Sequence, residues 1–237
     1  MRAAVLAVLV SLPVHAADLA VLVVTGSADK AAASKQLEAV KKKAADLDAV
    51  LKFAPGFPKL EESAAVTGLK PGFFIVVAGY CADDKLLPAV KALDPGAYAK
   101  MVQVDDAACP SLAERIEVKT AEAKDAEKRV LRATLFATTD ERDSWLLHLS
   151  WRDKTGAVLA ERLVPENDAA GCMYGGTAEL SARTGSITVK TTDCMKSRGC
   201  PNPGPATVAM TFTAAADKIA DEVKVLKDPG YKGCRGE

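Results

Sequence analysis

The sequence is poor in the residues and motifs that mark most catalytic sites. Aromatic residues make up 5% of its 237 residues, and it contains 2 histidines. It has no Gly-x-Ser-x-Gly nucleophile elbow, no His-Glu-x-x-His helix and no phosphate-binding glycine loop. These absences give no support to an enzyme, and no cofactor is expected. The abundant aliphatic residues predict cores built from Val, Leu, Ile and Ala.

An excess of charge of one sign is also lacking. Lys and Arg together number 31, and so do Asp and Glu. A nucleic-acid partner held by bulk electrostatics is therefore not expected. The one tight basic run, Lys41 to Lys43, is expected on the water-facing side of a helix.

The N-terminal segment has the features of an export signal. Arg2 precedes an apolar run from Ala3 to Val10, and Val14 to Ala16 has the small-residue pattern at which a signal peptidase cuts. An uncleaved anchor is the alternative, because Leu19 to Val24 is also apolar, but a proline and polar residues separate the two runs. We expect residues 1–16 to be a cleaved signal peptide. The mature chain is then periplasmic or extracellular, with no membrane span.

Export decides how the six cysteines are interpreted, because disulfides are the default outside the cytosol. The nearest pair, Cys194 and Cys200, has wider spacing than the cysteine pairs of structural zinc sites. No metal site is therefore predicted. The predicted disulfide cysteines are Cys81, Cys109, Cys172, Cys194, Cys200 and Cys234.

The first half of the chain, residues 17–116, alternates between strand and helix patterns. Leu19 to Val24 is a buried strand run that precedes a long helical pattern, and Phe73 to Gly79 is the strongest strand. A second helix is expected from near Lys85, followed by a closing strand at Tyr98 to Val104. The order is β-α-β-β-α-β, the ferredoxin-like split β-α-β arrangement, in which two helices cover one face of a four-stranded sheet.

The run Val76-Val77-Ala78-Gly79-Tyr80, followed by a short loop and a helix, resembles the SPOR (sporulation-related repeat) family. These small domains of bacterial envelope proteins bind peptidoglycan glycan strands. Gly79 fits the family's run of strand, Gly, small residue and Phe, whereas Tyr80 and Cys81 differ from its last two positions. The resemblance covers at most residues 17–105. It implies that peptidoglycan or another envelope component binds the uncovered sheet face and the rim near Tyr80 and Tyr98.

The second half, residues 117–237, changes to an alternating pattern and predicts a mostly antiparallel β domain with disulfides. Thr120 to Lys128 is expected to be a polar connector, and Ala214 to Leu226 fits a helix or a strand. The fold class predicted for the whole chain is α+β. The expected strands are Val130 to Thr138, Trp145 to Trp151, Gly156 to Val164, Met173 to Ala182, Ser186 to Asp193 and Thr207 to Thr213.

The cysteines divide as two in the first domain and four in the second, as pairing within each domain requires. Cys81 follows the third strand of the first domain and Cys109 follows the fourth. Because these strands run parallel on either side of the first, their ends lie on one rim. The sequence therefore predicts a Cys81–Cys109 disulfide, while the other four cysteines admit three pairings.

His148 is the one histidine outside the signal segment, and Ser150 lies two residues along the same strand face. A surface or structurally satisfied histidine is favoured over a catalytic one, because no nucleophile motif accompanies it. The opposite face carries Trp145, Trp151 and the leucines between them, which we expect in a core.

The function that the sequence favours is a noncatalytic binding module of the bacterial cell envelope. One alternative is an extracytoplasmic hydrolase that uses His148 or an acidic pair. Another is a structural or assembly protein that offers an exposed β edge to a partner.

Overall fold

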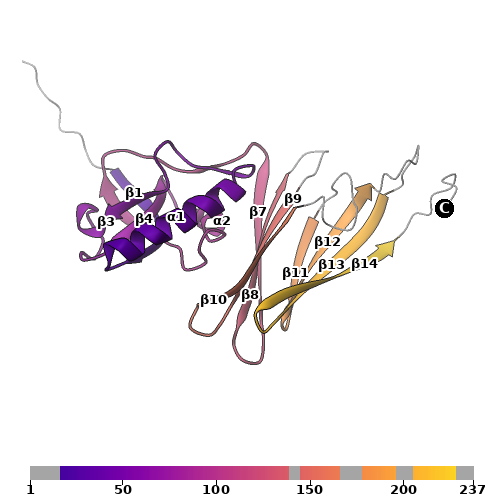
Figure 1. The fold of residues 1–237 in the computed structure, drawn as a ribbon. Coiled ribbons are helices and arrows are strands. Elements are labelled where there is room, and N and C mark those ends of the chain that lie inside the picture. The colour runs from indigo at the N-terminus through magenta and orange to yellow at the C-terminus, as the bar shows by residue number, and fades with distance from the viewer. Residues whose placement is uncertain (1–16, 139–144, 166–177, 196–204, 228–237) are drawn as a thin grey trace, which may run out of the picture.

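Strands dominate the chain in a computed structural model, which describes residues 17–138, 145–165, 178–195 and 205–227 (Figure 1). The described residues form two α-helices, one short 3-10 helix and four antiparallel sheets. Figure 1 shows the helices gathered at the N-terminal end, followed by two sheets that pack face to face.

The first unit is built on a four-stranded sheet of order β3-β4-β1-β5, in which each neighbouring pair is antiparallel. Two further strands, β2 and β6, form a small separate sheet. The bounds are β1 Ala17–Ser27, α1 Lys30–Asp46, β2 Leu51–Lys52, β3 Lys59–Glu62, the 3-10 helix Ser63–Ala65, β4 Phe74–Cys81, α2 Leu87–Val90, β5 Tyr98–Val104 and β6 Ser111–Leu112.

Both faces of this first sheet are covered. On one face, Leu22 and Val76 pack with Val40 and other residues of α1 in a buried core. The opposite face packs under the segment 53–72, which contributes buried Val66. The expectation of an uncovered sheet face for ligand is therefore wrong, because Phe57, Val66 and Leu69, which flank β3 in sequence, pack over the apolar side chains there.

The predicted fold class, α+β with an N-terminal split β-α-β, ferredoxin-like domain, is also wrong. That arrangement requires two helices that are long enough to cover one face of the sheet, but α2 is a single turn, Leu87–Val90. Beyond that turn, Ala92 and Leu93 donate to carbonyls three residues back, so the chain continues in tight turns. The chain is β-rich, with four antiparallel sheets and only α1 as a long helix.

Helix α1 begins one residue after its capping side chain. Asp29 has extended backbone angles, and its carboxylate accepts the Ala32 amide at 2.6 Å. Ser27 accepts the backbone amide of Asp29 at 3.1 Å, which orients the chain as it enters the helix.

The second unit contains two four-stranded sheets, of orders β10-β9-β8-β7 and β11-β12-β13-β14. Strand β7 occupies part of the expected connector from Thr120 to Lys128, and it begins at the expected domain boundary. The ambiguous segment Ala214 to Leu226 is the β13–β14 hairpin. The bounds are β7 Ile116–Lys124, β8 Val130–Thr138, β9 Trp145–Arg152, β10 Val158–Pro165, β11 Ala178–Arg183, β12 Ser186–Met195, β13 Pro205–Ala215 and β14 Lys218–Lys227.

The facing sides of these two sheets form a common core. Leu147, Leu149 and Trp151 of β9 are fully buried there, together with Ile187 and Phe212. The prediction that this stripe lies in a core is confirmed for these three β9 residues. The side chain of Trp145 lies outside the described part of the structure.

The outer face of the β10-β9-β8-β7 sheet packs against the first unit. Phe136 of β8 is fully buried in the same core as Val90 and Leu93, and Leu146 of β9 packs against that core. Lys43 of α1 forms an ion pair with Glu161 of β10 at 2.8 Å. The two units are therefore joined by a shared apolar core and by polar contacts.

The predicted signal peptide, residues 1–16, lies outside the described residues. Among the described helices, none has both the length and the apolar character needed to cross a membrane.

Candidate functional site

Tyr80, a predicted ligand residue, is buried rather than available at a rim. Its side chain is 6% exposed and its hydroxyl donates a hydrogen bond to the carboxylate of Glu61. The ring of Phe57 packs edge-on against it, with centroids 6.1 Å apart. Burial, followed by the neighbouring Glu61, raises the pKa of Tyr80. Tyr80 is therefore a structural residue under the segment that covers the sheet.

Tyr98, the other predicted ligand residue, lies in an open groove of about 390 Å³. Its side chain is 45% exposed, and Phe73, which is 40% exposed, lines the same groove. Val23 and Ile75 supply apolar lining. The volume lies within the range of about 300 to 1,000 Å³ that is typical of small-molecule sites.

Polar groups also line this groove. Its lining residues include Thr25, Lys70 and Asp94, which carry a hydroxyl, an ammonium group and a carboxylate. One oxygen of Asp94 accepts the Gly96 amide at 2.7 Å, which orients the carboxylate. The groove thus combines exposed aromatic rings with hydrogen-bonding groups, and the Lys70 ammonium group lies 5.9 Å from the centroid of the Phe73 ring.

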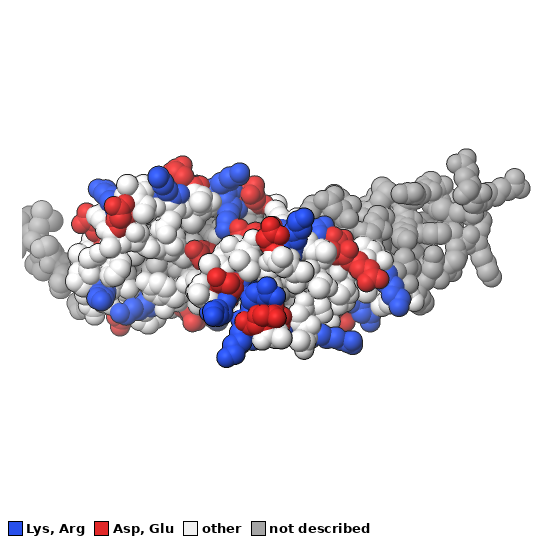
Figure 2. Space-filling view, turned by 60° about the horizontal axis from the view of Figure 1, so that its bottom comes forward, with Lys and Arg blue, Asp and Glu red and all other residues white. Residues whose placement is uncertain are grey.

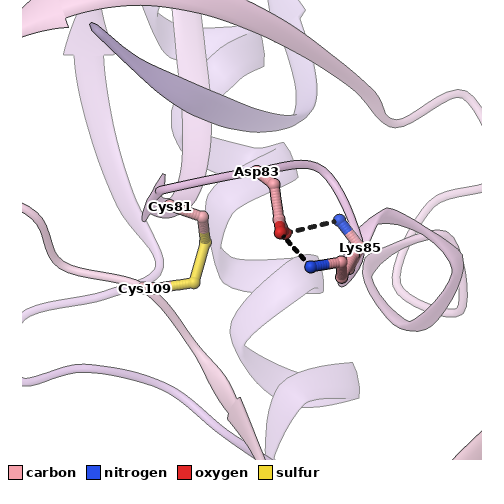
Figure 3. Close-up of a disulfide and its surroundings, with 4 residues drawn as sticks. All are labelled: Cys81, Asp83, Lys85 and Cys109. Carbon is pink, nitrogen blue, oxygen red and sulfur yellow. Dashed lines mark hydrogen bonds and ion pairs between the residues drawn. A yellow bond between two sulfur atoms is a disulfide. The ribbon is translucent and has the colours of Figure 1, made fainter.

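A disulfide joins Cys81 at the end of β4 to Cys109, with their Cα atoms 4.6 Å apart (Figure 3). This agrees with the pairing predicted from the two strand ends. Close by, the carboxylate of Asp83 accepts the Lys85 amide at 3.1 Å and pairs with its ammonium group at 2.6 Å. The disulfide ties the segment after β5 to the end of the strongest strand.

The other predicted disulfides lie in the part of the chain without described side chains. Cys172, Cys200 and Cys234 are outside the described residues. Cys194 belongs to β12, where its backbone pairs with Ala206. Their pairing stays a prediction.

His148 lies on the face of β9 that packs against the first unit, and it is 8% exposed. A small hollow of about 160 Å³ beside it is also lined by Lys43, Asp46 and Glu161. Burial lowers the pKa of His148 to about 4, although Glu161, 3.8 Å away, opposes the shift. The imidazole is therefore neutral near pH 7.

The arrangement around His148 lacks the parts of a hydrolase site. Ser150 lies on the same face but does not line the hollow, and its hydroxyl makes no hydrogen bond with the described residues. None of the residues that line the hollow is a serine, threonine or cysteine. Nothing here joins the histidine to an activated nucleophile, which acyl transfer requires.

Charges of both signs are mixed on the face of the molecule that Figure 2 shows. Among the described residues, no group of three or more His, Cys, Asp or Glu side chains is placed to hold a metal ion.

Sequence reasoning missed Phe73 as a candidate site residue. It was assigned to the start of a strand, whereas the structure begins β4 at Phe74. The Gly68–Gly72 turn before it was the available signal, because binding residues are found disproportionately on surface loops.

Comparison of the chain with family models, curated proteins and solved structures found no match. The candidate sites therefore rest on their own geometry.

Proposed function

We propose that this protein is a noncatalytic binding module of the bacterial cell envelope, exported beyond the inner membrane. We further propose that the groove lined by Phe73 and Tyr98 binds a glycan. The observation that carries the proposal is the pair of exposed aromatic side chains in one groove. The resemblance of Val76 to Tyr80 to the SPOR motif directs the choice of glycan to peptidoglycan.

The chemistry of the groove suits a sugar. A pyranose ring has an apolar face that can lie on an aromatic ring and hydroxyl groups around its edge. Phe73 and Tyr98 offer the rings, while Thr25, Lys70 and Asp94 offer hydrogen-bonding groups. The Gly96 amide orients the carboxylate of Asp94, which can accept hydrogen bonds from sugar hydroxyl groups.

Sedimentation of the mature protein with purified peptidoglycan sacculi tests this proposal. We expect the wild type to pellet with sacculi, and Phe73→Ala and Tyr98→Ala each to weaken binding by about three- to tenfold, the loss of one aromatic contact. Met101→Ala is the matched control, because Met101 is an exposed apolar residue of β5 that does not line the groove. Wild-type protein that stays in the supernatant would contradict the proposal.

A further inference from the structure

A second polar region lies at the junction of the two units, on the outer face of the β10-β9-β8-β7 sheet. Arg132 of β8 stands directly across from Ser150 of β9, and Arg152 follows two residues along β9. Because residues two apart on a strand share a face, all three side chains lie on one surface. This is the face whose apolar part, around Phe136, packs against the first unit.

Several donors on this surface are buried without partners among the described residues. Nε and Nη2 of Arg152 form one edge of its guanidinium group, and neither donates a hydrogen bond. Nε of Arg132 is also buried and unpartnered, while its Nη1 donates to Glu122 at 2.8 Å. The hydroxyl of Ser150, a residue that is 1% exposed, has no partner either. Native proteins rarely bury such groups unsatisfied.

The nearby carboxylates are engaged elsewhere. Glu161 pairs with Lys43, Glu122 with Arg132, and Asp94 accepts the Gly96 amide. None of them forms an ion pair with Arg152. Burial lowers the pKa of Arg152, the carboxylate of Asp94 opposes that shift, and the positive charge of Arg132 adds to it. Two like charges with free donors are therefore held close together.

A hollow of about 300 Å³ opens beside Arg132. Lys85 and Lys91 line it, together with Asp84 and the apolar residues Leu87 and Pro88. Lys85 is paired with Asp83, whereas Lys91 forms no ion pair with the described residues. Of Arg132, Ser150 and Arg152, only Arg132 lines this hollow. The hollow thus has a positively charged side chain available to attract an anion.

We propose that Arg132, Ser150 and Arg152 form a binding site for an oxyanion, a carboxylate or phosphate group, at the junction of the two units. The Nε–Nη2 edge of Arg152 matches two oxygens of such a group, which is the geometry of bidentate recognition. Nε of Arg132 and the hydroxyl of Ser150 supply further donors. None of these three residues lines the aromatic groove, although Asp94 lines that groove and also acts on the charge of Arg152.

Side-chain nuclear magnetic resonance of the full mature chain tests the site, with two probes. Inorganic phosphate represents a phosphate group, and N-acetyl-alanyl-alanine represents a peptide carboxylate. We expect at least one probe to shift the Nε–H signals of Arg132 and Arg152 saturably. A response to phosphate alone or to the dipeptide alone assigns the source of the anion. The absence of a saturable shift with both, up to roughly millimolar concentrations, overturns the proposal.

Substitutions separate binding from folding. Arg152→Lys keeps the charge but loses the two-donor edge, and we expect it to weaken binding about tenfold. Ser150→Ala, a smaller change, is expected to weaken it by a lesser factor. Arg183→Gln is the control, because Arg183 is exposed at the far end of β11. Equal affinity in Arg152→Lys and wild type overturns the proposal, and loss of sacculus binding in Phe73→Ala leaves it untouched.

Discussion

His148 is kept neutral by its surroundings at the scale of a single residue. The charged groups that influence its pKa include the carboxylate of Glu161 and three cations, Lys43, Arg132 and Arg152. Burial is the largest cause of its low pKa, and the cations add to it. A histidine in this setting serves packing at the junction better than proton transfer near pH 7.

This burial predicts a pH dependence of stability. The pKa of His148 is about 4 in the folded chain and ordinarily about 6.5, so the unfolded chain binds the extra proton between these values. Stability is therefore expected to fall by up to about 3 kcal/mol through this group as the pH drops from about 6.5 to about 4. Urea unfolding of wild type and His148→Gln at pH 7 and pH 4.5 measures it. The variant should lose less stability than wild type, and equal losses would contradict the assignment.

Predictions for single residues succeeded where the order of strands along the chain was sufficient. The cysteines at positions 81 and 109 were paired from the order of strands, and the structure joins them. Tyr80 was misjudged because the residues that cover it, Phe57 and Glu61, come from a distant part of the chain. Exposure depends on such long-range neighbours, which sequence patterns do not specify.

At the scale of elements, β4 depends on a close approach by another segment. Tyr80 and Ala108 exchange both backbone hydrogen bonds, which brings residues 108–110 against Gly79. A Cβ added at Gly79 would contact the carbonyl oxygen of Ala108 and would lie 2.6 Å from Cδ of Pro110. The glycine is therefore required by packing between backbones.

We expect Gly79→Ala to reduce the free energy of unfolding by about 1 to 3 kcal/mol, because a methyl group must displace backbone there. Urea unfolding under oxidising conditions measures the change. Gly96→Ala is the control, since its Cβ would lie closest to the movable carboxylate of Asp94, at 3.1 Å. The control should lose less stability. A larger loss in Gly96→Ala than in Gly79→Ala would contradict the role given to Gly79.

Secondary-structure elements were predictable where the spacing of apolar residues along the sequence was distinctive. The strand Val130 to Thr138 was predicted with the bounds of β8. The second helix was overestimated because Leu87, Val90 and Leu93 recur every three residues, a spacing that tight turns satisfy as well as an α-helix does. β7 was missed because its charged residues, alternating with others, were interpreted as a polar connector.

At the scale of the whole molecule, the junction between the units has an apolar anchor. Phe136 comes from β8 of the second unit and is fully buried in the core of the first. Deleting such a ring removes packing from both sides at once. We therefore expect the junction to couple the folding of the two units.

We expect Phe136→Ala to cost about 3 to 5 kcal/mol and to split one calorimetric unfolding transition into two. Phe212→Ala is the matched control, because it deletes an equally buried ring from the core between the two sheets of the second unit. We expect this variant to destabilise the second unit and to leave the number of calorimetric transitions unchanged. One transition in Phe136→Ala, with a stability loss like that of the control, would argue against coupling through this ring.

The sequence by itself determined strands β8 to β13 of the second unit, the aliphatic cores and the pairing of Cys81 with Cys109. The alternation and spacing of apolar residues and the order of strands along the chain carry that information, because the direction of side chains repeats regularly along a strand or helix. Only the tertiary structure decided that both faces of the first sheet are covered, that Tyr98 rather than Tyr80 lines a groove, and that Arg132 and Arg152 meet at the junction. These outcomes depend on which distant segments pack together, and burial across such contacts is set by the whole fold.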